Sequence, residues 1–477
     1  MTAISALRAV SWSAADVILR QGVQFGVAIA LARLLTPADF GTVSLLYLFA
    51  GIAGTFATGG LTTALIQARE VSRADESTVF WFNLAVGVLM GLAFWLCGPL
   101  IARFYEAPVL EPLSTVMAVT VVITAAGGIQ QALLTKHLNF RPLMISSVLA
   151  VLTSGAVSIW LAWRGEGVWA LAAQSLVSAA TATLVLWIAN PWRPQWVFSL
   201  ASARRLFGFG GYMMAASLLD VVYSRLYTVL IGKLYGAREL GFYARAETTA
   251  QLPSSMLGLI VGRVAFPLFS RMGDDPERVR DGLKRALQAT MFVNTPVMLG
   301  LAAVAEPLIQ VMFGDVWLPC VPYFQVLCIA GVFAPLHVLN LQVLMGLGRS
   351  DLFFRLELAK KVLGILILCM AAMFGVLAMA WGTLLGSVLF FGINTYYSNR
   401  LIGYGTVMQL RDVGVILGSA AVMAGLVVVI APHLAIQAPL RLLALSLSGA
   451  LAYALLAFAF KVPGVQPVTA MLRRRAN

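Results

Sequence analysis

Apolar residues fill long segments of this chain, and each segment is about as long as a membrane-spanning helix. The pattern predicts helices at roughly residues 10–33, 38–60, 79–101, 111–134, 143–163, 167–189, 206–232, 243–268, 286–313, 320–346, 354–376, 377–399, 413–431 and 440–460. Most of them reach the roughly 20 residues that a helix needs to cross the hydrocarbon core. The connections are short and leave no room for a separate soluble domain. The sequence therefore predicts an all-α integral membrane protein with about 14 transmembrane helices.

Charged and polar residues interrupt several of these segments. In the first helix, Asp16, Arg20 and Gln24 are spaced four residues apart and share one face, where Asp16 can pair with Arg20. In the seventh, Asp220 lies near Arg225, which has no acidic residue three or four positions away. A charge at bilayer depth costs at least a few kcal/mol, so such residues usually face a bundle interior or a wet cavity.

The eighth helix continues this pattern. Arg245 and Glu247 lie near one end of it, and Arg263 lies deeper. A protein with a charged interior is expected to move a polar or anionic substrate across the membrane. We therefore expect one substrate cavity to be lined by Asp16, Arg20, Gln24, Asp220, Arg225, Arg245, Glu247 and Arg263, with Asp16 and Asp220 as candidates for binding a coupling ion.

Structural roles also remain open for some of these side chains. Asp16 and Arg20 could form a purely intrahelical pair, while Arg245, Glu247 and Arg263 could extend to a membrane interface. Outside this set, Glu357, Lys360 and Lys361 suggest an interfacial cluster. His337 with Asn340 could be a relay, but we expect a hydrogen-bonded core histidine.

The composition agrees with a membrane protein. Hydrophobic residues make up 60% of the 477, charged residues only 11%, and the mean hydropathy is +0.88, whereas soluble domains carry about 25% charged residues. The four cysteines are scattered through apolar segments without a CxxC pair, so we expect neither a disulfide framework nor a metal site. No motif calls for a cofactor, and Gly208–Gly211 is not a phosphate loop because no Gly-Lys-Ser/Thr follows it.

The net charge of +13 is mainly a topology signal. With a cytoplasmic N-terminus, about 23 of the 33 Lys and Arg residues fall on the inner side and about 6 on the outer side. An even number of helices then places both termini of this multi-pass membrane protein on the cytoplasmic side. Nucleic-acid binding is not expected, because the basic residues are spread over many short loops.

A short motif recurs at an offset of 200 residues. Residues 30–41 and 230–241 share, in register, a basic residue (Arg33, Lys233), a leucine, an acidic residue (Asp39, Glu239) and a final glycine. Six predicted helices separate the copies, so both halves have the same orientation and predict two six-helix lobes with a site between them. We expect an N-lobe at 1–190, a C-lobe at 191–400, and two additional helices with a basic tail at 401–477.

Several ordered motifs resemble one protein family. They are Thr36–Gly41, Gly60–Gln67, Ser77–Trp81, Gln131–Leu134, Gly167–Gln174, Leu240–Ala246 and Val264–Arg271. Together they are similar to bacterial polysaccharide flippases, the Wzx-type branch of the multidrug/oligosaccharidyl-lipid/polysaccharide (MOP) exporter superfamily, and most of all to its colanic-acid-exporter-like subgroup. The resemblance covers most of the first 275 residues.

This resemblance implies a fold, a substrate and partners. Members have two six-helix lobes around a central cavity lined by the first, second, seventh and eighth helices. They flip undecaprenyl-diphosphate-linked oligosaccharide units across the inner membrane by alternating access, for exopolysaccharide, capsule or O-antigen biosynthesis. The expected partners are this lipid-linked substrate, membrane lipid, and a polysaccharide polymerase with its chain-length regulator.

Three alternative functions are weighed against this one. A lipid II-type flippase differs little in mechanism, whereas a multidrug or cation antiporter should favour acidic residues in its cavity, and the positions here are at least as basic as acidic. A membrane polysaccharide polymerase or ligase would be an enzyme with a large periplasmic loop, which this chain lacks. The sugar unit, the coupling ion and the oligomeric state are not specified by the sequence.

Overall fold

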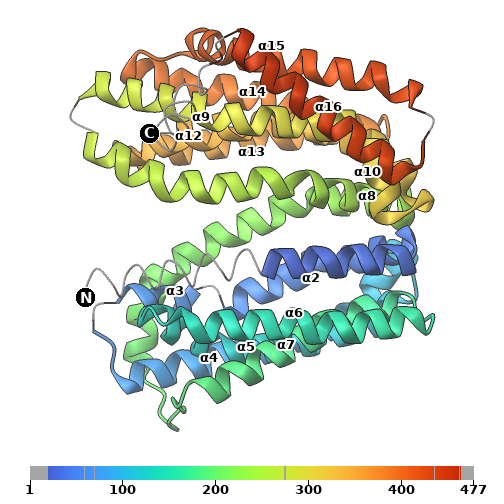
Figure 1. Ribbon diagram of the computed structural model, residues 1–477. Coiled ribbons are helices and arrows are strands. Elements are labelled where there is room, and N and C mark those ends of the chain that lie inside the picture. The colour runs from blue at the N-terminus through green and yellow to red at the C-terminus, as the bar shows by residue number, and fades with distance from the viewer. Residues whose placement is uncertain are drawn as a thin grey trace, which may run out of the picture. The chain divides into compact units, whose positions relative to one another are not determined.

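The computed structural model describes residues 20–462 apart from 59, 69, 273, 274, 435 and 461, and within these residues its regular secondary structure is helical (Figure 1). The side chains of 58, 209, 259–264, 266–268 and 271 are also outside the description. Residues 20–34 are helical. The other helices are α2 (Pro37–Thr58), α3 (Gly60–Gln67), α4 (Arg73–Tyr105), α5 (Leu110–Lys136), α6 (Phe140–Trp163), α7 (Val168–Ala189), α8 (Leu200–Met272), α9 (Pro276–Ala303), α10 (Ala305–Phe313), η1 (Asp315–Cys320), α11 (Val321–Gly331), α12 (Ala334–Gly346), α13 (Ser350–Ala371), α14 (Val376–Ile402), α15 (Thr406–Ile430), η2 (Ala431–His433) and α16 (Ala438–Ala459).

Eleven helices in the described part of the chain are long and apolar enough to cross a membrane. The difference from fourteen has three sources. The first predicted helix is described only from Arg20 onward. Helix α8 merges two predicted spans across a kink at Gly236, where φ is 84°, and α13 carries several charged residues. The all-α membrane architecture is confirmed, while the count of fourteen stays a prediction.

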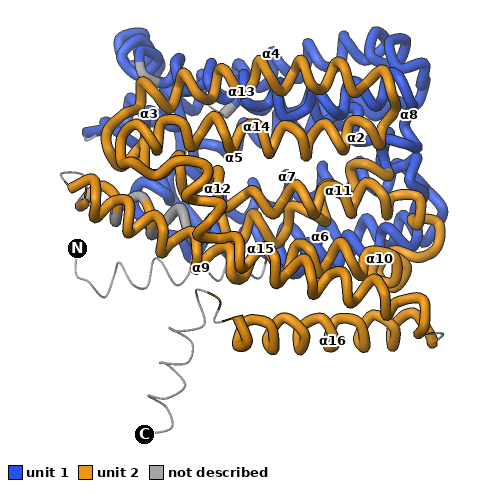
Figure 2. Tube along the Cα trace, turned by 90° about the horizontal axis from the view of Figure 1, so that it is seen from above, with its two compact units in different colours: residues 1–241 blue, residues 242–477 orange. Residues whose placement is uncertain are grey.

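The chain forms two compact units, residues 1–241 and 242–477 (Figure 2). In unit 1, α4 packs on α5 and α6 on α7, and α2 lies against both α4 and α5. In unit 2, α9 packs on α15, α13 on α14, and α11 on α14, while α16 lies against α10 and α15. The lobe boundaries at 190 and 400, which follow from the helix repeat, remain a prediction.

Local sequence signals explain where several helices begin and end. Thr36 and Asp39 bond to each other at the start of α2, with the Thr36 hydroxyl 2.7 Å from Asp39 Oδ2 and Pro37 in the first turn. Ser72 and Asp75 form a capping box at the start of α4, which satisfies amide groups that the helix leaves free. Gly403 ends α14 in the left-handed conformation that glycine adopts without strain.

The two copies of the repeat contact each other within unit 1. A methyl group added to Gly41 would collide with the carbonyl oxygen of Ala237, and one added to Gly241 would collide with the carbonyl oxygen of Pro37. The two contacts are reciprocal, because 37 and 41 correspond to 237 and 241 at an offset of 200. Nearby, Lys233 Nζ lies 3.0 Å from Glu106 Oε1. The backbones of α2 and α8 therefore approach as closely as glycine allows.

Candidate functional site

The polar residues of unit 1 include a cation placed over an aromatic ring. Arg225 of α8 is exposed, and its guanidinium carbon lies 5.7 Å from the ring centroid of Tyr47 on α2, within the range of a cation–π interaction. Asp220, about one turn earlier on α8, is exposed as well. The two helices pack closely here, since a methyl group on Gly51 would lie 3.0 Å from Val221 Cγ1. Arg225 thus retains an accessible guanidinium while Tyr47 limits where it can point.

The first helix contributes Arg20 and Gln24, which are both exposed and lie one turn apart. Asp16 lies outside the described residues, so its pairing with Arg20 remains a prediction. The structure therefore places four of the predicted cavity residues in unit 1 with exposed side chains. Their assembly into one substrate cavity also remains a prediction.

Arg245 has different surroundings in unit 2. It is only 8% exposed, and its guanidinium carbon lies 5.1 Å from the Phe313 ring and 5.3 Å from the Trp317 ring. Both rings are buried. A desolvated cation–π contact is worth about 2 kcal/mol, so these rings fix the side chain in the packing of α8 against α10 and η1. Its place in a substrate cavity and the alternative place at a membrane interface both stay predictions.

Two further predicted residues lie on the same helix. Glu247 is partly buried and accepts a hydrogen bond from Gln251 Nε2 at 3.2 Å. Arg263 lies in the helical backbone of α8, but its side chain is outside the described residues. The place of both residues in a substrate cavity stays a prediction.

A break divides the tenth predicted span into α11 and α12. The chain makes tight turns there, from Val332 N to Ile329 O at 3.2 Å and from Phe333 N to Ala330 O at 3.1 Å. The side chain of Asn294 on α9, which is fully buried, donates to Gly331 O at 3.0 Å. The sequence pattern missed this break because the whole segment is apolar, although Pro335 marks it. The side chain of Asn294 thus gives a hydrogen bond to a backbone carbonyl at the break.

A buried polar cluster follows the break, on α12, α14 and α15. The side chain of Asn340 is its centre: Ser398 Oγ donates to Asn340 Oδ1 at 2.6 Å, and Gln409 Nε2 donates to the same oxygen at 2.9 Å. All three residues have an exposed fraction of 0%. One turn earlier, His337 Nδ1 lies 3.2 Å from Asn394 Nδ2. The expected hydrogen-bonded core histidine is therefore confirmed, with Asn394 rather than Asn340 as its partner.

An ion pair lies on the neighbouring helix α13. Lys360 Nζ is 2.5 Å from Glu357 Oε1, and Lys360 is only 8% exposed. The side chain of Lys360 is therefore packed among helices, while the place of this cluster at a membrane interface stays a prediction. Within the described residues, no group of three or more His, Cys, Asp or Glu side chains is arranged to hold a metal ion.

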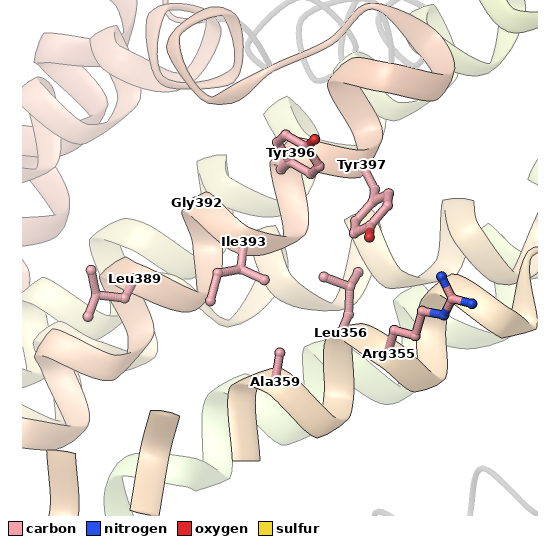
Figure 3. A pocket seen from close by; sticks show the side chains of 8 residues that line it. All are labelled: Arg355, Leu356, Ala359, Leu389, Gly392, Ile393, Tyr396 and Tyr397. Carbon is pink, nitrogen blue, oxygen red and sulfur yellow. The ribbon is translucent and has the colours of Figure 1, made fainter. Parts of the chain in front are cut away.

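A groove of about 470 Å³ lies on α13 and α14 of unit 2 (Figure 3). It is lined by Arg355, Leu356, Ala359, Leu389, Gly392, Ile393, Tyr396 and Tyr397. Arg355 and Tyr397 lie near one end of the groove and Leu389 near the other (Figure 3). A separate pocket of about 700 Å³ is almost wholly apolar and is lined by Leu366, Ile367, Met370, Ala371, Phe374, Ala378, Trp381, Gly382 and Leu385. The groove is thus mostly apolar and has one basic side chain, Arg355, at one end.

Comparison with known proteins identifies the family. Residues 30–322 match the family described as "Polysaccharide biosynthesis protein". The chain belongs to this family. The match covers more than half of the chain and confirms the resemblance read from the ordered motifs.

Several curated relatives are similar in sequence to this family member over most of its length. The chain is 30% identical to the lipopolysaccharide biosynthesis protein WzxC of Escherichia coli (strain K12), over 81% of this chain and 78% of the relative. It is 29% identical to the succinoglycan biosynthesis transport protein ExoT of Rhizobium meliloti (strain 1021), over 74% and 72%. It is 28% identical to the teichuronic acid biosynthesis protein TuaB of Bacillus subtilis (strain 168), over 83% of each.

Solved structures show the fold of this polysaccharide biosynthesis protein. The lipid II flippase MurJ in an inward closed conformation matches with a TM-score of 0.75 and 14% identity, over 94% of this chain and 98% of that one. A multidrug resistance MATE family transporter of the MOP superfamily, in an inward-facing conformation, matches with a TM-score of 0.60 and 14% identity, over 82% and 99%. The chain is thus a multi-span membrane protein with the MOP fold.

Proposed function

We propose that this protein is a secondary flippase that moves undecaprenyl-diphosphate-linked oligosaccharide units across the bacterial inner membrane by alternating access. The supporting observation is that most of the chain is similar in sequence to polysaccharide biosynthesis proteins and in fold to a lipid flippase. Its sequence relatives are named for lipopolysaccharide, succinoglycan and teichuronic acid biosynthesis, and its fold is that of a lipid II flippase. In this proposal it is a transporter and not an enzyme, with a polysaccharide polymerase and a chain-length regulator as partners.

The substrate path in this proposal uses the exposed cations of unit 1. Arg20 and Arg225 would contact the diphosphate or an acidic sugar, because a guanidinium supplies charge together with two parallel donors. Asp16 and Asp220 would balance these cations between transport cycles. Both termini would lie in the cytoplasm.

The test is complementation of strains that lack a polysaccharide flippase. The expected result is restored surface polysaccharide and loss of the lipid-linked units that accumulate on the cytoplasmic leaflet. A strain depleted of its lipid II flippase and a strain sensitive to cationic drugs serve as parallel recipients. Growth rescue in the lipid II strain alone, or drug resistance alone, would replace the proposal with the corresponding alternative.

The groove of α13 and α14 supports membrane lipid as a further partner. Arg355 and the two tyrosine hydroxyls suit an anionic headgroup, while the apolar remainder suits an acyl chain. Native mass spectrometry of the purified protein should detect anionic phospholipid that Arg355→Ala reduces. Arg400→Ala is the matched control, because Arg400 lies at the same end of α14 but does not line the groove. Equal lipid retention by all three proteins would remove the groove from the proposal.

A further inference from the structure

The connection between α7 and α8 is bound to the start of α4 within unit 1. Its residues 190–199, here called the linker, are not helical. The indole of Trp192 donates a hydrogen bond to Glu76 Oε2 at 2.6 Å, and the backbone amide of Ser199 donates to Thr78 Oγ1 at 3.0 Å. These partners are 116 and 121 residues apart in the sequence. The tertiary structure therefore fixes the path of the linker.

The linker presents large apolar side chains on its outer side. Trp196 is 89% exposed, and its ring stacks on that of Trp81 of α4, with the ring centroids 4.4 Å apart. Val197, Phe198 and Leu200 are exposed as well. Contiguous exposed apolar side chains mark surfaces that contact a membrane or another protein. Because the linker is held in place, this surface is already formed before any partner binds.

The same stretch of chain is basic. Residues 190–208 contain Arg193, Arg204 and Arg205 and no acidic residue, and all three arginines are exposed. Arg205 binds Asp75 through one terminal nitrogen, at 2.8 Å, and Arg193 uses one terminal nitrogen for two backbone carbonyls. A guanidinium has five N–H donors, so both side chains can also bind an anion.

The neighbouring spans place this surface at the edge of the membrane. One candidate span ends at Ala189 and the next begins at Gly210, so the linker and the first turns of α8 lie between them. Helix α4 has 33 residues, more than the roughly 20 that cross the hydrocarbon core, and the linker binds its first turns. Tryptophan is enriched at the level of the lipid headgroups, because its ring is apolar and its N–H is polar.

We propose that the linker and the first turns of α8 form a binding site for anionic phospholipid at the membrane surface. In this site Trp196 and Phe198 lie at the level of the headgroups, while the phosphates are bound by Arg193, Arg204 and Arg205. A lipid fits better than a protein partner, because the surface adjoins two spans and its charge complements anionic headgroups. The site is separate from the groove of α13 and α14 and does not depend on what the protein transports.

The first experiment locates Trp196 relative to lipid and water. The full protein, labelled with fluorotryptophan, is reconstituted in nanodiscs of phosphatidylcholine and phosphatidylglycerol, and Trp196→Phe assigns the ¹⁹F NMR signal. We expect a lipid with a spin-labelled headgroup to broaden this signal more than a water-soluble paramagnetic agent does. Trp317, which is fully buried, is the control and should respond weakly to both. Broadening of the Trp196 signal mainly by the water-soluble agent would overturn the site and favour a protein partner.

The second experiment varies the lipid charge. The fraction of phosphatidylglycerol is raised, and the Trp196 signal should shift as the lipid binds. Arg204→Glu should weaken this response roughly tenfold or more, because basic residues near the surface attract anionic lipid, whereas Arg204→Lys should keep most of it. Arg285→Glu is the matched control, since Arg285 is an exposed arginine on α9 and the change in net charge is the same. The Trp192 signal reports in the same spectra that the linker still binds α4. A response that is absent in the wild type, or equal in Arg204→Glu and the wild type, would overturn the proposal.

Discussion

At the residue scale, arginine side chains have different surroundings in the two units. Arg225 is exposed beside the ring of Tyr47, whereas Arg245 is buried between Phe313 and Trp317. The guanidinium of Arg225 is accessible, whereas that of Arg245 is enclosed by two aromatic rings. A substitution at each should therefore affect a different property of the protein.

For Arg225, the prediction concerns export. Arg225→Ala should reduce polysaccharide export strongly at normal abundance, because losing a charge-assisted contact costs about 1.5–3 kcal/mol, or roughly 10- to 150-fold in affinity. Arg225→Lys should recover some export if charge alone matters. The measurement is complementation with the protein level determined in the same cells. Full export by both Arg20→Ala and Arg225→Ala would leave these residues with a structural role.

For Arg245, the prediction concerns stability. Arg245→Met keeps much of the apolar stem but removes the cation, and it should destabilise unit 2 by about 1–2 kcal/mol through loss of the contacts with Phe313 and Trp317. Thermal unfolding of the purified protein measures this effect. Arg278→Met, at an exposed position in the first turns of α9, is the control. An unchanged unfolding temperature for Arg245→Met would show that the aromatic contacts contribute little.

The sequence predicted which residues are charged within spans, but not what surrounds them. Arg245 meets rings about 70 positions further along the chain, and no local pattern indicates that contact. The spacing of Glu357, Lys360 and Lys361 does not show that Lys360 is buried, and only the packing of α13 on its neighbours does. Local charge spacing carries no information on which face of a helix the next helix covers.

At the element scale, the length of the apolar segments predicted where helices lie, but it did not predict where they are interrupted. The expected span at 143–163 agrees with α6 at Phe140–Trp163, and that at 167–189 agrees with α7 at Val168–Ala189. The expected spans at 286–313 and 320–346 are each broken, near Val304 and at Val332–Phe333. Mean hydropathy does not change at such a break, because apolar residues continue through it.

The glycine contact between α2 and α8 gives a second stability prediction. Gly41→Val should lower the abundance and thermal stability of the protein, since overpacking against the Ala237 carbonyl costs about 1–3 kcal/mol. Gly241→Val should have a similar effect through the Pro37 carbonyl. Gly54→Ala on the same helix α2 is the control, as no atom lies within 4 Å of its added methyl group. If all three proteins unfold alike, the close contact is not essential to the packing.

At the scale of the whole molecule, the distribution of basic residues predicts the topology. Reporter fusions at Arg103 or Arg164 should report the periplasm, and fusions after Lys284 or Arg473 should report the cytoplasm, because cytoplasmic loops carry the excess of Lys and Arg. Paired enzymatic and fluorescent reporters measure this in intact cells. A periplasmic C-terminus would exclude fourteen spans with both termini inside.

The repeat predicts internal symmetry of the whole molecule. The backbones of roughly 10–189 and 206–399 should superpose by a rotation about an axis along the membrane normal, since both halves have the same orientation. An experimental structure that fixes both halves relative to each other measures this rotation. An inverted repeat, or no repeat at all, would contradict the expectation.

The reciprocal glycine contact also has an evolutionary consequence. A surface that pairs position i with position j, and j with i, is what two identical subunits form around a two-fold axis. Residues 37 and 41 meet 241 and 237 in this way. If the gene arose by duplication, the contact was once a homodimer interface, and fusion turned an association between subunits into a permanent one. In a homodimer of half-length ancestors, this one glycine position would have made the contact twice, once from each subunit.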